Sequence, residues 1–159
     1  MKVTLDIGEI EMAKAIARTR SSNNRMAGVV CRMRSPSNTS EEEINGMGAE
    51  LAYCKAFNIY PDFSVTPRKG GHDCVHHGKT VDVKVTPHIN GHLLVLPHKE
   101  EHGVEMYALV VGWMPNYTIA GYATRDEVFI DDNLKDMGHG VSHAISQEEL
   151  HEYDDRHKH

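Results

Sequence analysis

Two short runs of alternating apolar and polar residues flank His77-Gly78, and this pattern predicts a β-hairpin over residues 73–86. Gly accepts a positive φ freely and His does so more readily than most residues, which suits a two-residue turn. With this turn, Asp73 lies opposite Asp82, and period-2 alternation places Lys84 on the same face as Asp82. The opposite face is apolar and is made of Cys74, Val81, Val83 and Val85.

Helical periodicity predicts a helix over about residues 7–20, which begins at a capping box formed by Asp6 and Glu9. The polar run 21–24 is expected to interrupt it.

A second capping pattern at Ser40 predicts a helix that ends near Asn58, before a Tyr-Pro pair. Glu50 lies at the edge of its apolar stripe. That stripe contains Ile44, Met47, Leu51 and Cys54.

The second half of the chain alternates between apolar runs and turns. A continuously apolar run at 106–113 predicts a strand that is buried on both faces. Further short strands are predicted at 63–66, 93–96 and 117–123. A capping pattern at Thr124 predicts a short helix to about Ile130, and one or two helical turns are expected within 146–152.

Length and composition place the chain among soluble globular proteins. It has 159 residues, 40% hydrophobic and 25% charged. No apolar run approaches the roughly 20 residues that span a bilayer, so a cytoplasmic protein with no membrane partner is expected. The cysteines are odd in number and widely spaced, which indicates reduced thiols. We predict an N-terminal helix and basic arm (1–39), a core (40–130) and an acidic, His-rich C-terminal extension (131–159).

Charge is unevenly distributed within a net charge of −6. Residues 1–40 contain seven Lys and Arg against three acids, whereas residues 126–159 contain three against ten. The acidic overall charge argues against nucleic-acid binding by the global field alone. A local phosphate-binding patch is one interpretation of the N-terminal arginines, and an ordinary solvated face is the other. These arginines are Arg18, Arg20, Arg25, Arg32 and Arg34.

The polar face of the predicted hairpin requires an explanation. Asp73 and Asp82 would have Cβ atoms roughly 4.5–5.5 Å apart, where like charges repel. A bound cation would relieve this repulsion. In the alternative interpretation, Asp82 and Lys84 form a surface ion pair while Asp73 caps a turn.

A helix followed by a hairpin that carries D…DxK, and then by further strands, resembles the PD-(D/E)XK nuclease superfamily. The resemblance rests on Glu50, Asp73 and Asp82-Val83-Lys84, and the run 48–52 (Gly-Ala-Glu-Leu-Ala) is similar to the Glu-bearing helix of such nucleases. Residues 107–110 and 121–127 resemble small phage-encoded members. The similarity covers about residues 40–130.

The resemblance implies an α/β fold: a restriction-endonuclease-like mixed β-sheet core of five or six strands with flanking helices. It implies Mg²⁺- or Mn²⁺-dependent hydrolysis of DNA phosphodiester bonds, as in phage DNA processing or recombination. Asp73, Asp82, the carbonyl of Val83 and Glu50 would hold the metal ion, directly or through water. Lys84 would orient or help to deprotonate the attacking water. DNA is the implied partner, and a homodimer is left open.

Several alternatives stay open. Pro61-Asp62 is the literal Pro-Asp pair, so Asp62 rivals Asp73 as the second acid. His72, Cys74 and His76 alternate along one strand and could be a metal trio, although a buried Cys74 with histidines at the rim is preferred. The superfamily places a helix between the hairpin and the next core strand, whereas 87–105 does not predict one. The alternative functions are an inactive nuclease-fold domain that binds nucleic acid or protein, and a His-rich transition-metal-binding protein.

Overall fold

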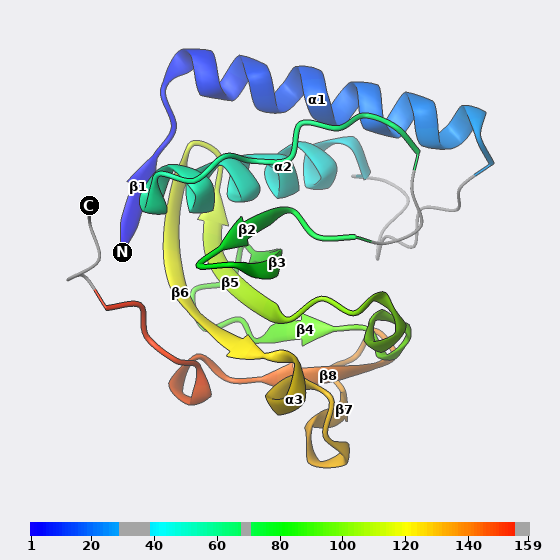
Figure 1. Ribbon diagram of the computed structural model, residues 1–159, viewed down its shortest axis with the longest axis vertical. Coiled ribbons are helices and arrows are strands. Elements are labelled where there is room, and N and C mark those ends of the chain that lie inside the picture. Colours follow the sequence, from blue (N-terminus) through cyan, green and yellow to red (C-terminus); the bar gives the residue numbers. More distant parts are fainter. Residues whose placement is uncertain (29–38, 68–70, 155–159) are drawn as a thin grey trace.

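A five-stranded sheet separates two long helices from a smaller sheet in the computed structural model, which describes residues 1–28, 39–67 and 71–154 (Figure 1). The helices are α1 (Ile7–Met26), α2 (Thr39–Phe57) and α3 (Arg125–Val128). The first four strands are β1 (Lys2–Thr4), β2 (Cys74–His76), β3 (Lys79–Thr86) and β4 (Leu93–Val95). They are followed by β5 (Met106–Trp113), β6 (Asn116–Thr124), β7 (Leu134–Asp136) and β8 (Val141–Ile145). Short 3-10 helices are η1 (Pro97–His102), η2 (Asp131–Asn133) and η3 (Gln147–Glu149).

The main sheet is mixed, with the strand order β1-β6-β5-β3-β2. β3 and β5 pair in parallel, and the other neighbouring strands pair antiparallel. The connection from β3 to β5 passes through β4 and η1, and β4 belongs to a second antiparallel sheet of order β4-β8-β7. The predicted α/β class with a mixed sheet and flanking helices is therefore confirmed.

The hairpin has the predicted turn. His77 and Gly78 have φ values of 49° and 77°, which are the positive values that a two-residue hairpin turn uses. Cys74 pairs with Val81 and His76 pairs with Lys79, as expected from this turn. Regular pairing stops at Cys74, because the N–H of Asp73 donates to the carbonyl of Val81 at 2.8 Å. Asp73 thus enters the hairpin at the point where the ladder becomes irregular, and the predicted direct pairing of Asp73 with Asp82 is not formed.

Helix α2 lies between α1 and the main sheet (Figure 1). Its predicted stripe is largely confirmed: Met47, Leu51 and Cys54 are buried in one core cluster with residues of α1 and of the sheet, and Ile44 packs against this cluster but is only partly buried. Burial extends to Ala49, Ala52 and Tyr53 as well. A helix covered on two sides needs apolar residues around most of its circumference.

The prediction that residues 21–24 interrupt the first helix is wrong. α1 continues to Met26, and its capping box at Asp6 and Glu9 is present as predicted. Tertiary contacts hold the polar turn in the helix: the Asn23 side chain donates to the carbonyl of Val65 at 2.9 Å. The second helix includes Ser40 and begins at Thr39, one residue before the predicted cap.

Residues 63–66 do not form the predicted strand. The carbonyl of Val65 is taken by the Asn23 side chain, and the Ser64 carbonyl accepts from the Arg20 guanidinium at 2.9 Å. Since side chains of α1 satisfy these backbone groups, the segment needs no second strand beside it.

The second sheet brings the acidic C-terminal part of the chain into the fold. β7 and β8 lie within residues that the sequence pattern left as polar extension, and β8 pairs with β4. Ala144 and Ile145 of β8 are buried. A second core cluster fills the space between this sheet and the far face of β5. The domain boundaries predicted at residues 39 and 130 stay a prediction.

Two further expectations concern membrane spanning and the state of the cysteines. None of the helices within residues 1–28, 39–67 and 71–154 combines the length and apolar character needed to cross a membrane. Cys54 and Cys74 are free and buried, and Cys31 lies outside the described residues. The cytoplasmic location and the homodimer stay predictions.

Candidate active site

A polar cavity of about 270 Å³ lies just before the first residue of β2, beside β3. It is lined by residues of α1, α2, β3 and η1, and by Ser64, Thr66, Gly71 and Asp73 from the chain before β2. The ionisable side chains that line it are Arg20, Glu50, Asp73, Asp82, Lys84 and Lys99. The structure therefore brings together in one cavity the four residues for which the sequence predicted catalytic roles.

Asp73 is fixed to β3 by its side chain. Its Oδ2 atom accepts a hydrogen bond from the backbone N–H of Val83 at 2.7 Å, while its own N–H donates to the carbonyl of Val81. The carboxylate thus occupies the position along β3 where the next residue of β2 would have paired. The backbone of Val83 lines the same cavity. Within a strand, the N–H and C=O of one residue point to the same side, so the Val83 carbonyl also faces this edge.

Asp82 and Lys84 form a partly buried ion pair on β3. The Lys84 Nζ lies 2.6 Å from Asp82 Oδ1, and the side chains are 26% and 7% exposed. Lys99 of η1 approaches the other oxygen, Asp82 Oδ2, at 4.0 Å. Burial opposes the charge of Lys84, but the carboxylates of Asp82, Asp73 and Glu50 together more than offset this effect and raise the lysine pKa above its ordinary value. Lys84 is therefore a firmly protonated ammonium at neutral pH.

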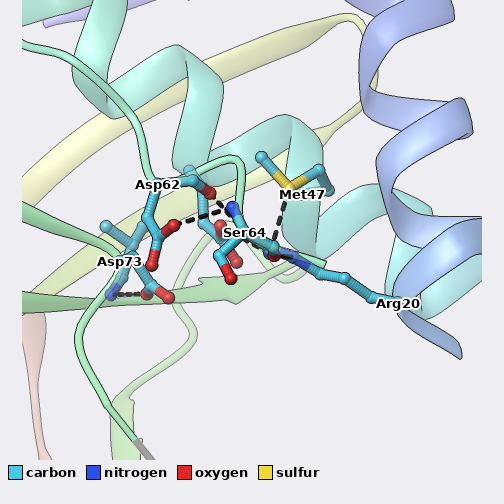
Figure 2. Close-up of polar contacts among 7 residues, drawn as sticks. Arg20, Met47, Asp62, Ser64 and Asp73 are labelled. Atoms are coloured by element: carbon cyan, nitrogen blue, oxygen red, sulfur yellow. Dashed lines mark hydrogen bonds and ion pairs between the residues drawn. The ribbon is translucent and has the colours of Figure 1, made fainter. Parts of the chain in front are cut away.

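Glu50 projects from α2 and is paired with Arg20 of α1, with Nη1 and Oε2 3.1 Å apart. The same guanidinium donates to the carbonyls of Asp62 and Ser64 and contacts the sulfur of Met47 at 3.2 Å. Figure 2 shows Arg20 reaching from its helix toward Ser64, with Asp62 and Asp73 beside it. Arg20 thus clamps the 62–64 segment against α2.

Two of the buried carboxylates, Asp73 and Glu50, have raised pKa values. Burial, and then the charge of Asp82, raise the pKa of Asp73 to about 7, against the opposing effects of Lys84, the Val83 N–H and Arg20. Burial, and then the charge of Asp73, raise the pKa of Glu50 well above its ordinary value. Ionising these carboxyl groups inside the cavity is therefore unfavourable, and an additional cation bound there would lower this free-energy cost.

Asp62, the alternative to Asp73 as the second acid, does not line this cavity. Its Oδ1 accepts from the backbone N–H of Ser64 at 2.8 Å, a local turn, and its own N–H donates to the carbonyl of Asp73 at 3.0 Å. Asp62 lines a neighbouring hollow and not the cavity of Asp82. Asp73 is the acid that shares a cavity with Asp82.

The alternating His72, Cys74 and His76 do not gather around one point. Cys74 is buried in the core, as preferred, but the expectation that His76 lies at the rim is wrong. The Nδ1 of His76 pairs with the hydroxyl of Tyr53 at 2.7 Å, because β2 turns this side chain toward the C-terminal end of α2. Burial, and then His77, lower the pKa of His76, so its imidazole is neutral at pH 7.

The predicted nucleic-acid-binding arginines separate into distinct groups. Arg18 and Arg25 are exposed on one side of α1, roughly 140–160° around the axis from Arg20 at about 100° per residue. Arg20 faces the cavity and uses its guanidinium on protein acceptors. Arg32 and Arg34 lie outside the described residues. The structure therefore assigns Arg18 and Arg25 to a surface that faces away from the cavity.

Sequence reasoning missed two residues beside the acids. Lys99 comes from η1, in a stretch whose fold the sequence did not predict. Tyr107 is the register partner of Asp82 on β5, and burial, and then Asp82, raise its pKa to about 12. Within the described part of the chain its buried hydroxyl has no hydrogen-bond partner. Tyr107 could have been found only from the parallel pairing of β3 with β5, and no local sequence pattern predicts this pairing.

The oxygen donor set suits a hard divalent cation such as Mg²⁺ or Mn²⁺ more than a metal ion that prefers thiolate or imidazole ligands. The cavity offers carboxylates of Asp73, Asp82 and Glu50 together with backbone oxygen, and Mg²⁺ takes one or two carboxylates and several waters. As the side chains stand, no group of three His, Cys, Asp or Glu residues in the described ranges forms a metal cluster. Instead, Lys84 and Arg20 neutralise Asp82 and Glu50.

Comparison with family models, curated proteins and solved structures finds no match for this chain. The function is therefore inferred from the side chains of the cavity.

Proposed function

We propose that this protein is a metal-dependent nuclease of the PD-(D/E)XK type, which hydrolyses DNA phosphodiester bonds with Mg²⁺ or Mn²⁺. The observation that carries the proposal is the convergence of Glu50, Asp73, Asp82 and Lys84, from a helix and both arms of a hairpin, on one buried polar cavity. The pKa of Asp73, raised to about 7, supports a functional site, since strongly perturbed carboxyls cluster where chemistry occurs.

Asp73, Asp82 and the Val83 carbonyl would hold the ion, with Glu50 binding it directly or through water. A bound divalent cation would polarise the phosphate and lower the pKa of an attacking water. Asp82 would exchange its contact with Lys84 for the ion, which frees the ammonium for the phosphate. The ion would then lie between the carboxylates of Asp73 and Asp82 and would screen their mutual repulsion.

Lys84 would act as a cation. Since its raised pKa keeps it protonated at neutral pH, it orients the water and holds negative charge as this develops on the phosphate. Lys99, 4.0 Å from Asp82, adds a second ammonium on the η1 side. Arg20 fixes Glu50 and is a positioning residue.

The finer fold assignment belongs to the same proposal. A helix that carries Glu50, a hairpin that carries the Asp and Lys residues, and a parallel strand beside β3 agree with a restriction-endonuclease-like core. The crossover from β3 to β5 contains β4 and η1 where the superfamily has a helix.

One observation favours a second function, a nuclease-fold domain that binds nucleic acid or protein without cutting. Lys84 and Arg20 already neutralise Asp82 and Glu50 directly, so the cavity is electrostatically stable in part without an ion. This state would also be the resting form of an enzyme that loads its metal with substrate.

The test is cleavage of supercoiled plasmid, linear duplex, single-stranded and branched DNA with Mg²⁺ or Mn²⁺. Asp82→Asn and Lys84→Met should each lower the rate by about 100-fold or more. Asp132→Asn in η2 and Lys135→Met on β7 are matched controls at exposed positions and should retain full activity. If purified wild-type protein cuts none of these DNAs with either ion, the nuclease proposal fails.

A further inference from the structure

A second hollow of about 610 Å³ adjoins the candidate active site. Ser64 lines both spaces, and Asp62 and Asp73, joined by a backbone hydrogen bond of 3.0 Å, stand on either side of the shared wall. The volume lies within the roughly 300–1,000 Å³ typical of ligand sites. A ligand with its phosphate at Lys84 therefore has room for an adjoining group in the second hollow.

The lining of this hollow differs from that of the cavity. Ile59, Tyr60, Phe63, Cys74 and Val75 contribute apolar surface, and His72 contributes an imidazole. Tyr60 is 81% exposed and Val75 is 48% exposed, although both belong to residue types that folding normally covers. The hollow therefore has largely apolar walls and is open to a ligand from solvent.

Tyr60 and Phe63 form a corner. Their ring centroids are 5.4 Å apart and their planes meet at 78°. A flat aromatic ligand that stacks on one ring presents its edge to the other, and both arrangements are favourable for aromatic pairs. Nearby, His72 offers ring nitrogens to polar atoms on the ligand's edge.

We propose that this hollow binds an unpaired nucleobase of the DNA strand whose phosphate lies at Lys84, so that the substrate is single-stranded, as in an overhang, a flap or a frayed end. This inference rests on the proposed function, because the phosphate position comes from the candidate active site. A base within a duplex is already stacked on its neighbours, whereas an unpaired base gains a stacking partner in the Tyr60–Phe63 corner. A charged cavity beside an aromatic wall is also the pairing of features that single-strand binders use.

The first experiment measures binding apart from catalysis. In an Asp82→Asn background, fluorescence anisotropy reports binding of a labelled 12-nucleotide single strand and of the same sequence as a blunt duplex. Tyr60→Leu should weaken single-strand binding by about tenfold and leave duplex binding unchanged. Tyr60→Phe, which keeps the ring, should bind as the parent does. Ile130→Ala is a control for loss of exposed apolar surface elsewhere, since Ile130 is 45% exposed beside the second sheet.

A base analogue identifies the contact directly. The fluorescence of 2-aminopurine placed in the oligonucleotide should fall on binding to the parent protein and fall less with Tyr60→Leu. In cleavage assays with otherwise wild-type protein, Tyr60→Leu should raise KM for a flap substrate more than it lowers kcat.

The outcomes separate the two proposals. If the DNA is cut but Tyr60→Leu binds the single strand as tightly as the parent and quenches 2-aminopurine equally, the base site is wrong and the nuclease proposal stands. If binding depends on Tyr60 but no divalent ion supports cleavage, the nuclease proposal fails and the base site stands. If the parent protein prefers blunt duplex, the substrate assignment is wrong.

Discussion

The carboxylate of Asp73 accepts a hydrogen bond from the backbone N–H of Val83 at 2.7 Å, ten residues further along the same hairpin. This contact replaces a rung of the β2–β3 ladder and directs Asp73 toward Asp82. The irregular end of a short strand thereby places two acids at one edge of the sheet, and burial makes their charge expensive.

The first prediction is that Asp73 destabilises the metal-free protein at alkaline pH. Its pKa is about 7 in the folded protein, against an ordinary value of 3.8, so the folded state binds the proton more tightly than the unfolded state does. Its contribution to stability is therefore full below about pH 4 and is lost as the pH rises toward 7. Asp73→Asn keeps an oxygen for the Val83 N–H and should raise the free energy of unfolding by about 1–3 kcal/mol at pH 8.

Chemical denaturation at pH 4 and pH 8 without divalent ions checks this prediction. The gain from Asp73→Asn should vanish at pH 4. The exposed Asp132→Asn is the control and should change stability little at either pH. A loss of stability with Asp73→Asn at pH 8 would show that the ionised carboxylate is favoured in the fold, contrary to this account.

The second prediction concerns competition between metal ions and protons. Because the pKa of Asp73 is about 7, a divalent ion must displace a proton from this carboxyl below that pH. The Mn²⁺ concentration that half-saturates the protein should therefore rise by up to about tenfold per unit as the pH falls from 7 to 6. Isothermal titration calorimetry measures this directly, together with the protons released. Equal affinity at pH 6 and pH 8 would exclude Asp73 as a titrating ligand.

The third prediction contrasts two arginines of α1. Arg20→Met removes hydrogen bonds to the Ser64 carbonyl and to Glu50, and it leaves a largely buried Glu50 without its cation. We expect a loss of about 2–4 kcal/mol in the free energy of unfolding, since breaking a buried ion pair from one side is costly. Arg18→Met, on the exposed far side of the helix, should stay within about 0.5 kcal/mol of wild type. Urea denaturation of both variants is the measurement, and equal effects would show that Arg20 is not a clamp.

The fourth prediction contrasts two glycines of α2. A Cβ at Gly46 would meet no atom within 4 Å, so Gly46→Ala should stabilise the protein by about 0.5–1 kcal/mol through helix propensity. A Cβ at Gly48 would clash with the hydroxyl of Tyr117, which is held by Asn45 at 2.7 Å. Gly48→Ala should therefore destabilise by about 1–3 kcal/mol despite the same gain in propensity. Thermal unfolding of the pair decides between packing and propensity.

Local sequence patterns correctly predicted the hairpin turn and the start of α1. The turn at His77-Gly78 depends on residues that tolerate positive φ, and the alternation of its arms fixed which side chains share a face. The Asp6 and Glu9 capping box likewise uses contacts within four residues. Such features are visible in sequence because the interacting groups are neighbours along the chain.

Distant contacts decided the remainder. α1 passes through a polar run because Asn23 bonds to Val65, and the second sheet forms because β8 pairs with β4, about fifty residues earlier in the chain. In the cavity, the sequence alone placed Asp82 and Lys84 on one face of a strand. The family resemblance grouped Glu50 with them, but only the tertiary structure brought Arg20 and Lys99 to the site. Burial and charge pairing act between elements that are far apart in the sequence, so local patterns do not reveal these contacts.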